Sequence, residues 1–442
     1  LVQVDVRRQW TERAALRNPN LTGCSDDLFY QPQNLRVLDP FGNQAQQFGM
    51  LDRVKIAGQI HVNRVRHAPH HTASNLSQCT MRRSLGSIPI GVRAKVGLED
   101  GFEDQLLANI TQIIDPKSID AVISNHTEMD HSGSLPQVMD AIGRDKPIYC
   151  SKMGLRNLPM HFPKDLNYQA VNSGDTLELG KRTLRFIETR MLHWPDNMFT
   201  YVKEDKILFS SDAFGQHYAG HEKFDDQIGD SIMLHAKKYF ANILLLYSPL
   251  ILKLLEKVKE LGLEIDMICP DHGIIWREDP GKIINVYAKW SRQEPEQKAV
   301  VVYDTMWHST ETMAEKIVQG IVEAAVIAIP LPIRSSHRSE IMTEVLDAAA
   351  VIVGSPTINN QLFPTVSDIL TYMKGLKPKG RVGAAFGSYG WSGEAVRMIT
   401  EELQTMKFDV VAPGLRIQYV PDTEGLAACE DFGRQIAEAM KG

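Results

Sequence analysis

The last third of the chain repeats one pattern, in which an apolar, β-branched run is followed by an amphipathic helical run. The apolar runs are AVVVYDT, AAAVIVGSP and RVGAAFGSYG, and helical stretches such as TETMAEKIVQGIVEA separate them. Strands this apolar are buried on both faces, and helical crossovers join strands that run parallel. Residues 296–442 are therefore predicted to form a doubly wound parallel sheet. One run departs from the pattern, because VIAIPLPIR carries Pro330 and Pro332 where a second parallel strand is expected.

A charged stretch, SRQEPEQK, precedes this series and indicates a domain boundary near residue 295. Over residues 96–295 we expect another α/β domain, in which strands such as IDAVISNH, DKILFSSDAFG and IDMICPDHGIIW end in acids or histidines. Residues 1–95 differ from both: their basic residues are mostly Arg, acids are sparse, and no helical or strand period is visible. We interpret them as an atypical N-terminal segment, either a divergent extension or the product of a shifted reading frame.

Composition excludes several classes of protein. A net charge of -6 over 442 residues speaks against a nucleic-acid binder, which normally has a basic surface. The most apolar stretch, ANILLLYSPLILKLL, is interrupted by Asn, Pro and Lys, which indicates a buried helix and no membrane span. The N-terminus lacks the apolar core of a secretory signal. The 5 cysteines form no C-x-x-C pair, which fits a reducing compartment, so a cytoplasmic protein is expected.

The stretch ISNHTEMDHSGSLP places two histidines, a glutamate and an aspartate close together after a predicted strand. Imidazole and carboxylate groups together suit iron, manganese or zinc. One histidine alone is more often a satisfied polar residue than a ligand, but further candidates follow at later strand ends in MLHWPDN, LFSSDAFG and CPDHGI. Loops from several strand ends can converge at one edge of a sheet. The candidate metal ligands are His126, Glu128, Asp130, His131, His193, Asp212 and His272.

This set is too large for one tetrahedral ion and suits two ions that share a carboxylate. Asp212 is the natural bridge, because it is the one acid that its strand contributes alone. Other histidines weigh less as ligands. His70 and His71 belong to the region without periodicity, and His217 and His221 flank a loop that can line the entrance to the site.

Three loops at predicted strand ends suit a flavin. YDTMWHSTETMA opens a helix, and its hydroxyl groups, backbone N–H groups and helix N-terminus can surround a phosphate. It has neither the glycine pattern of a pyrophosphate loop nor the lysine of a nucleoside triphosphatase. GSPTINN and FGSYGWSG follow later strands, where such folds bind ligands, and the aromatic residues Tyr389 and Trp391 can flank a planar ring.

Each of these loops alone is better explained by a helix cap or a simple turn. Together, at successive strand ends, they predict FMN, and the first loop resembles the phosphate loop of flavodoxins. The residues assigned to FMN are Thr305, Met306, Trp307, His308, Ser309, Thr310, Ser355, Pro356, Thr357, Ile358, Asn359, Asn360, Ser388, Tyr389, Gly390, Trp391, Ser392 and Gly393.

From about residue 100 onward the chain resembles the flavodiiron proteins, also called A-type flavoproteins. The order H-x-E-x-D-H, then H, D and H, carries the resemblance, together with ETRMLHWPDNMFTY, SSDAFGQHYAG and DHGIIWREDPGKIINVYAKW. It implies an α/β fold, with a metallo-β-lactamase-like αββα domain over residues 96–295 and a flavodoxin-like domain over 296–442. Zinc hydrolases of that superfamily have H-x-H-x-D-H. Glu128 in place of the second histidine makes the site harder, which favours iron over zinc.

The resemblance also implies how the ligands divide between two iron ions. One iron is expected at His126, Glu128 and His193, and the other at Asp130 and His272, with Asp212 bridging them. His131 matches a position that is a ligand in some family members and turned away in others.

A flavin beside a di-iron site implies that electrons pass from FMN to a centre that reduces dioxygen to water or nitric oxide to nitrous oxide. The resemblance implies a head-to-tail homodimer, or a dimer of dimers, in which the FMN of one subunit lies near the irons of the other. The donor is expected to be separate, such as rubredoxin or a reduced deazaflavin. Two alternatives remain: a zinc-dependent hydrolase fused to a flavodoxin-like module, and a non-catalytic FMN electron carrier with a degenerate metal site.

Overall fold

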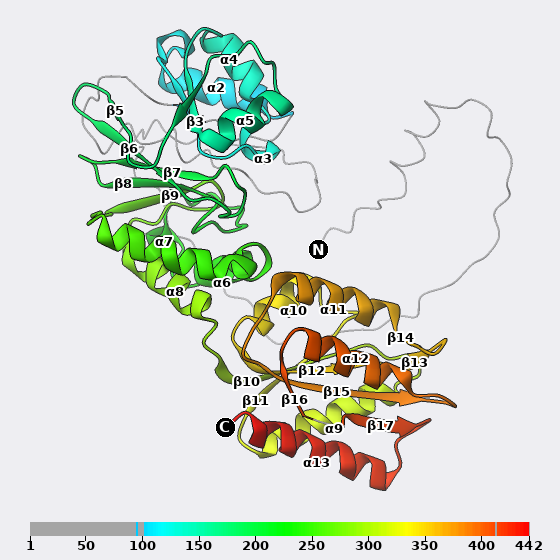
Figure 1. Cartoon of the computed structure of the whole chain (residues 1–442). Coiled ribbons are helices and arrows are strands. Elements are labelled where there is room, and N and C mark those ends of the chain that lie inside the picture. Colours follow the sequence, from blue (N-terminus) through cyan, green and yellow to red (C-terminus); the bar gives the residue numbers. More distant parts are fainter. Residues whose placement is uncertain (1–93, 96–100, 412, 442) are drawn as a thin grey trace, which may run out of the picture. The chain divides into compact units, whose positions relative to one another are not determined.

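The computed structural model describes residues 94–95, 101–411 and 413–441 (Figure 1). The atypical segment predicted for residues 1–95 therefore lies outside the described residues, apart from Ala94 and Lys95.

A four-stranded parallel sheet, in the order β1-β2-β3-β4, begins the described chain. Its strands are β1 (Ala94–Lys95), β2 (Val122–Ser124), β3 (Ile148–Ser151) and β4 (Tyr168–Val171). One face is covered by α2 (Glu103–Ile113), α4 (Leu135–Ile142) and α5 (Lys152–His161) (Figure 1). Because side chains alternate along a strand, Val122 packs under these helices and its neighbour Ile123 points to the opposite face.

A second sheet, β5-β6-β7-β8-β9, is antiparallel except for the β8–β9 pair. Its strands are β5 (Thr176–Glu178), β6 (Thr183–Glu188), β7 (Met198–Val202), β8 (Ile207–Ser211) and β9 (Met267–Pro270). One face packs on the first sheet, where Ile123 shares an apolar cluster with Phe186 and Cys269. The other face is covered by α6 (Ile232–Tyr239), α7 (Ser248–Glu260) and α8 (Pro280–Arg292). The layers run helix, sheet, sheet, helix, which confirms the predicted αββα sandwich.

The most apolar stretch of the sequence lies in the helices that cover this second sheet. Among the described residues, the helical run Ile232–Glu260 is long and apolar enough to cross a membrane by length and composition alone. It is broken by a π turn at Phe240–Leu244 and a 3-10 turn at Leu245–Tyr247, and Phe240, Leu244 and Leu245 are buried in the core. These contacts agree with the expected buried helix.

The C-terminal sheet has the order β11-β10-β12-β15-β16, with β17 also paired to β15, and all of these pairs are parallel. Its strands are β10 (Glu296–Tyr303), β11 (Ile327–Pro332), β12 (Ala348–Gly354), β15 (Val382–Tyr389), β16 (Asp409–Val410) and β17 (Leu415–Gln418). A small hairpin, β13 (Thr357–Ile358) and β14 (Gln361–Leu362), follows β12.

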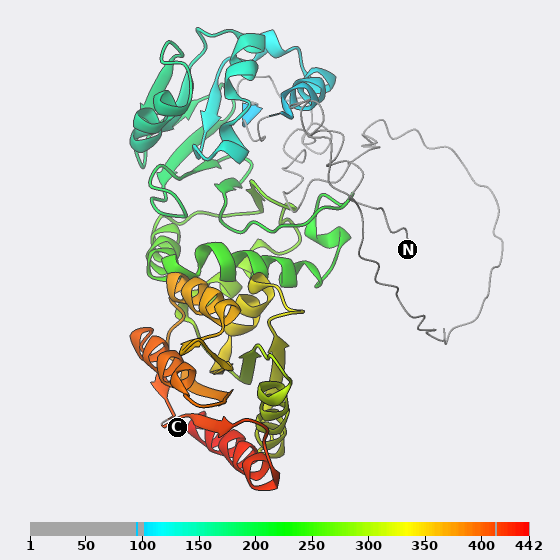
Figure 2. The same cartoon turned by 90° about the vertical axis from the view of Figure 1, so that its right-hand side faces the viewer.

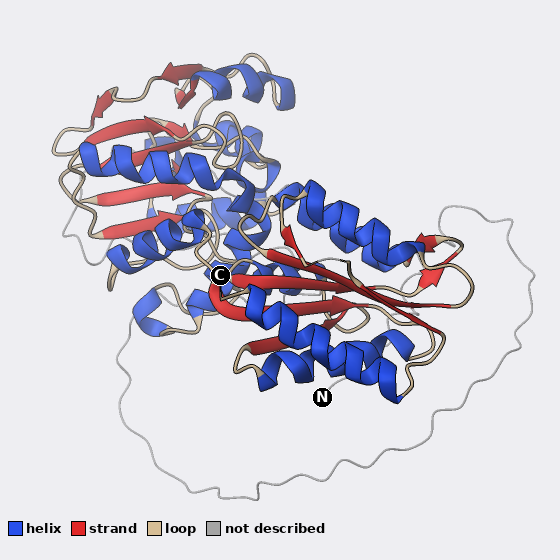
Figure 3. Cartoon of the chain, turned by 60° about the horizontal axis from the view of Figure 1, so that its bottom comes forward, coloured by secondary structure: helices blue, strands red, loops and turns tan. Residues whose placement is uncertain are grey.

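Helices cover both faces of this sheet (Figure 3). On one face α9 (Ser309–Glu323) and α13 (Thr423–Ala439) lie side by side (Figure 2). On the other face lie α10 (Arg338–Val345), α11 (Pro364–Leu376) and α12 (Glu394–Thr405). Along β10, Val301 packs under the first pair and Val302 under the second group, so the strand is buried on both sides. The doubly wound parallel sheet predicted from the apolar runs is confirmed.

The segment with two prolines forms β11, at one edge of this sheet. Pro330 pairs with Val301 of β10, and Pro332 pairs with Tyr303. An edge strand has one row of backbone groups that no neighbouring strand uses, so residues without an N–H group fit there. The segment therefore supplies the second parallel strand of the pattern despite its prolines.

Candidate metal and flavin sites

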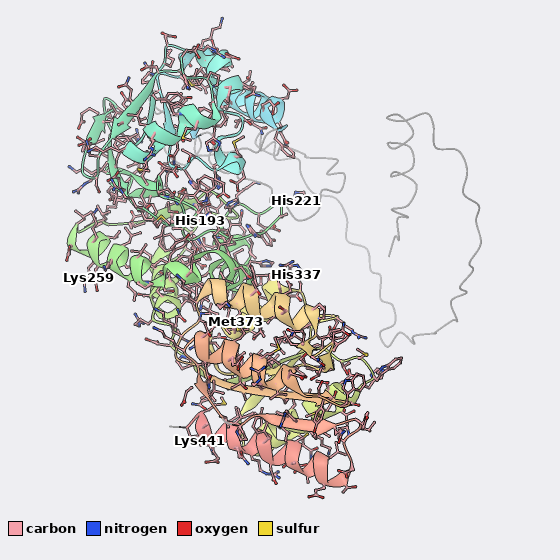
Figure 4. All side chains as sticks on the ribbon, turned by 45° about the vertical axis from the view of Figure 1, so that its right-hand side comes forward. His193, His221, Lys259, His337, Met373 and Lys441 are labelled. Atoms are coloured by element: carbon pink, nitrogen blue, oxygen red, sulfur yellow. The ribbon has the colours of Figure 1, made fainter. Side chains whose placement is uncertain are left out.

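The predicted metal ligands come from four loops that follow strands of the αββα sandwich. His126 and Glu128 lie in the loop after β2, and Asp130 and His131 lie in the short helix α3 (Met129–Ser132) that follows. His193, labelled in Figure 4, lies between β6 and β7. The remaining two are Asp212, directly after β8, and His272, two residues after the end of β9. These neighbouring strands run parallel and so end at the same edge of the sheet.

Four of these side chains form a first group. The Nε2 atom of His126 lies 3.1 Å from Oε2 of Glu128 and 3.2 Å from Oδ2 of Asp212. The Nε2 atom of His193 lies 3.0 Å from the same Glu128 oxygen and 3.5 Å from the same Asp212 oxygen. Two imidazole nitrogens and two carboxylate oxygens thus face one point.

The second group contains the other three side chains and the remaining oxygen of Asp212. The Nε2 atom of His131 lies 3.0 Å from Oδ1 of Asp212 and 3.3 Å from Oδ1 of Asp130. The Nε2 atom of His272 lies 3.2 Å from Oδ1 of Asp212 and 3.4 Å from Oδ2 of Asp130. His131, whose orientation the sequence left open, therefore points into this group. Asp212 stands between the two groups with one oxygen toward each.

Burial makes this arrangement costly unless a cation is present. Within the described part of the chain, Oδ1 of Asp130, Nε2 of His131 and Oδ2 of Asp212 are buried without a hydrogen-bond partner of acceptable geometry. Buried polar and charged groups are normally paired or coordinate a metal. The ligand atoms of His126, Glu128, His131 and Asp212 lie within 4.8 Å of one another, as do those of Asp130, His131 and His272, and imidazole with carboxylate suits iron. The residues therefore fit two metal ions.

The pKa values of the site residues show the same need for positive charge. Burial disfavours a charged imidazole at His126, but the carboxylates of Asp212, Asp196 and Glu128 outweigh it and raise the pKa to about 10. Burial opposes ionisation of Glu128, yet its contacts with His126 and His193 lower its pKa to about 2. Without a cation the site thus keeps its carboxylates charged by holding protons on His126 and His272, whereas burial lowers the pKa of His131. Metal ions would take over the role of those protons.

The ligands differ in their access to solvent. The side chains of His126 and Asp212 are fully buried, whereas Glu128 and Asp130 keep 32% and 34% of their side-chain surface exposed. These two carboxylates therefore mark the open side of the site, where a small molecule can enter. His217 lies nearby, with its ring centroid 5.4 Å from that of His272, and its place at the entrance stays a prediction.

Three residues at the site were missed by sequence reasoning. Asp196 places Oδ2 3.4 Å from Nδ1 of His126, and Tyr239 donates its hydroxyl to Oδ1 of Asp212 at 3.1 Å. Asp271 places Oδ2 3.8 Å from Nδ1 of His131. The two aspartates stand close to ligands in HWPDN and PDHG, and metal-bound imidazoles commonly have a carboxylate behind them, so that signal was present. Tyr239 lies within a helix, and no local signal marks it.

The three loops predicted to bind a flavin meet at one edge of the C-terminal sheet. The ranges 305–310, 355–360 and 388–393 lie at or just after the carboxyl ends of β10, β12 and β15, which are adjacent in the sheet. The hydroxyls of Thr310 and Ser388 lie 2.9 Å apart and join the first loop to the third. The Ser392 hydroxyl donates to Oδ1 of Asn360 at 3.1 Å and joins the third to the second.

The chemistry of these loops fits a phosphate with an attached planar ring. The Thr305 hydroxyl is buried and has no hydrogen-bond partner among the described residues, so it is available to a ligand. At the rim, Trp307 and Trp391 are 82% and 88% exposed, which leaves both indole faces open for stacking. Tyr419, which sequence reasoning missed, follows β17 and lies against the third loop, where its N–H donates to the carbonyl of Tyr389 at 2.7 Å.

Both parts of the chain match known families. The model of the "ODP family beta lactamase" matches residues 97–273, and the Flavodoxin model matches residues 301–433. Among relatives, the chain is 45% identical over 339 residues to a nitric oxide reductase of Moorella thermoacetica, covering 76% of this chain and 85% of the relative. It is 40% identical over 335 residues to an oxidase of a reduced coenzyme from Methanocaldococcus jannaschii, covering 73% and 80%.

Solved structures give the same comparison. The rubredoxin oxygen:oxidoreductase of Desulfovibrio gigas aligns with a TM-score of 0.76 at 40% identity and covers 78% of this chain and 86% of that one. The flavodiiron protein of Giardia intestinalis aligns with a TM-score of 0.75 at 33% identity and covers 79% and 88%. The similarity thus extends across both domains.

Proposed function

Because the chain belongs to the flavodiiron protein family, we propose that it takes electrons from a separate donor through FMN to a di-iron centre, which reduces dioxygen to water or nitric oxide to nitrous oxide. One observation carries the proposal: Asp212 turns one oxygen to each of two histidine–carboxylate groups. The same chain has a flavodoxin domain, which a hydrolase would leave without a role. The comparisons therefore favour an oxidoreductase over the zinc-hydrolase alternative.

The proposed ligands follow the two groups. His126, Glu128 and His193 would hold the first iron, Asp130, His131 and His272 would hold the second, and Asp212 would bridge them. His131 is included because its Nε2 atom faces Asp212 at 3.0 Å. When bound, the irons supply redox equivalents and open coordination positions for a diatomic gas. Because Glu128 and Asp130 are partly exposed, a small molecule could reach bound irons from their side, whereas His126 and His131 are buried.

For FMN, we propose that residues 305–310 surround the phosphate, and that residues 355–360 and 388–393 hold the ring. FMN, when bound, can accept electrons in pairs and release them singly. The buried Thr305 hydroxyl would donate to the phosphate, and the two exposed tryptophans, Trp307 and Trp391, would cover the ring. The link between Thr310 and Ser388 holds the phosphate loop against the ring loop.

Partners follow from the same chemistry. One similar protein is named for rubredoxin and another for the oxidation of a reduced coenzyme, so a rubredoxin or a reduced deazaflavin is proposed as the donor. A head-to-tail homodimer, or a dimer of such dimers, is proposed as the assembly in the cytoplasm. Exposed apolar side chains at both sites support it, since Met129 and Met191 are next to metal ligands in the chain and Trp307 and Trp391 belong to the flavin loops. Large exposed apolar residues near one another mark interaction surfaces.

Metal and flavin analysis of the purified full chain tests the proposal. About two irons and one FMN per chain are expected, and the reduced protein is expected to be reoxidised by dioxygen or nitric oxide in stopped-flow mixing. The gas that reoxidises the reduced protein at the higher rate is identified as the substrate. Zinc without iron, or bound FMN that neither gas reoxidises, contradicts the proposal; the second result favours the non-catalytic electron carrier.

A further inference from the structure

Edge strand β11 delivers an arginine to the flavin loops. Pro332 pairs with Tyr303, and the N–H of Ile333 donates to the carbonyl of Tyr303 at 2.9 Å. The next residue, Arg334, is thereby held over the carboxyl end of β10, where the loop 305–310 begins. Proline fixes its own φ near −65°, so the chain leading to Arg334 has little freedom.

Arg334 pairs there with a buried carboxylate. Asp304 accepts hydrogen bonds from the N–H of Thr305 at 2.7 Å, from Nε of Arg334 at 2.9 Å and from the hydroxyl of Thr365 at 2.5 Å. The guanidinium of Arg334 also donates to the carbonyl of Thr305. Within the described part of the chain, Arg334 is the one cationic side chain in salt-bridge contact with Asp304.

The two partners differ in solvent exposure, and this difference decides which charge depends more on the pairing. The Asp304 side chain is 1% exposed, whereas that of Arg334 is 59% exposed. Water therefore solvates the guanidinium, whereas the carboxylate is shielded from water in the folded protein. Removal of Arg334 would leave an uncompensated negative charge buried directly before the phosphate loop.

A phosphate monoester carries a charge of about −2 at neutral pH. A bare carboxylate under the loop 305–310 would repel it strongly in a poorly solvated site. A flavin without phosphate, riboflavin, would not meet this repulsion. Arg334 donates directly to the carbonyl of Thr305, and it also holds Asp304, which accepts from the N–H of Thr305. The buried Thr305 hydroxyl takes no part in these contacts and is free to donate.

We infer that Arg334 determines the cofactor specificity of the flavin site: by neutralising Asp304 it admits a phosphorylated flavin, and without it the site discriminates against the phosphate but not against the flavin ring. This inference rests on the proposed placement of FMN at these loops. Arg334 is a specificity-determining residue that acts through Asp304 and Thr305.

The test compares FMN with riboflavin on the full chain, stripped of flavin and titrated by fluorescence. In Arg334→Gln, FMN affinity is expected to fall about tenfold, as for the loss of a charged hydrogen bond, while riboflavin affinity changes less than about twofold. In Asp304→Asn/Arg334→Gln, FMN affinity is expected to recover most of the loss, because the buried charge is gone. Arg434→Gln is the control: this arginine pairs with Glu323 at the far end of α9, and both affinities are expected to stay at the wild-type value.

Several results would overturn the inference. Equal losses of FMN and riboflavin affinity in Arg334→Gln would mean that the arginine merely supports the loop. An unchanged FMN affinity, or no recovery in the double variant, would refute the charge argument. A wild-type chain that binds neither flavin overturns the proposed function and this inference with it, whereas wild-type binding with an unchanged FMN-to-riboflavin ratio in Arg334→Gln overturns this inference alone.

Discussion

The carboxylate of Asp196 lies 3.4 Å behind Nδ1 of His126, on the side of the ring opposite to Glu128 and Asp212. Both residues are buried, and the second Asp196 oxygen has no hydrogen-bond partner among the residues that the structure describes. A carboxylate in this position holds the proton on Nδ1 and leaves Nε2 free for a metal. The His126 ring is thus oriented by a residue that no ligand pattern includes.

Asp196→Asn should therefore weaken metal binding on the His126 side of the site. The amide keeps the shape of the side chain but removes the negative charge that makes the imidazole a better ligand. Iron affinity is expected to fall roughly tenfold or more, measured by chelator competition. Mössbauer spectra should show that one of the two irons is lost first. Asp165→Asn, at an exposed aspartate, is the control, and equal iron loss in both variants would contradict the orienting role.

Asp212→Ala should remove the di-iron centre while FMN stays bound. The substitution deletes the one carboxylate that faces both groups, so neither group keeps its full set of donors. Iron content should fall to less than one per chain and gas reduction should be lost, while the flavin absorbance remains. Retention of both irons with turnover would rule out the bridging role of Asp212.

Gly320→Ala should destabilise the flavodoxin domain, because helices α9 and α13 cross closely there. A Cβ atom at residue 320 would lie 2.0 Å from the carbonyl oxygen of Glu430, which is backbone and cannot rotate away. The free energy of unfolding should fall by about 1–3 kcal/mol in denaturant titrations.

Gly375→Ala is the matched control for the helix crossing. It replaces a glycine near the end of α11 that has no atom within 4 Å of the new Cβ. Alanine is the better helix former, so a gain of roughly 0.5–1 kcal/mol is expected. A loss of similar size in both variants would show that close packing at residue 320 is not the cause.

Asp347→Asn should lower stability in a pH-dependent manner. Asp347 lies 2.5 Å from Nζ of Lys298 and 2.6 Å from Nζ of Lys237, and Lys298 also pairs with Glu344. Burial raises the pKa of Asp347, but the two lysines outweigh it and hold the pKa below its usual value. A depressed carboxyl pKa stabilises the fold at pH values above the unfolded pKa, about 3.9, and this stabilisation disappears as pH falls through the folded pKa.

At pH 7 the Asp347→Asn variant should lose roughly 2–3 kcal/mol of stability. The difference from wild type should shrink below about pH 4. Burial lowers the pKa of Lys298, but its two carboxylate partners raise it overall, so the lysine stays charged from neutral pH up to its unfolded pKa of about 10.4. Guanidinium titrations of wild type and variant at pH 3, 5 and 7 measure the difference in the free energy of unfolding. A difference that stays constant over this pH range would contradict the ion-pair explanation.

Local sequence determined which residues are candidate ligands, because a ligand must be a particular chemical type and these residues follow strand ends. Strand and helix periods place His126, Asp212 and His272 at strand ends, and the apolar runs require a doubly wound sheet whatever the details of packing. Glu128 in place of a histidine favoured iron over zinc for the same reason, because the hardness of a ligand depends on its residue type.

Only the tertiary structure decided where side chains point. His131 and Asp212 are far apart in the chain, and the 3.0 Å contact between them depends on how two sheets pack. The same holds for Tyr239 on Asp212 and for Arg334 on Asp304. The prolines before Arg334 looked unfavourable for a strand, because sequence pattern does not tell an edge strand from a central one. Chemical type and period are local properties of a chain, whereas orientation and pairing arise from contacts between distant segments, and these exist only once the fold has formed.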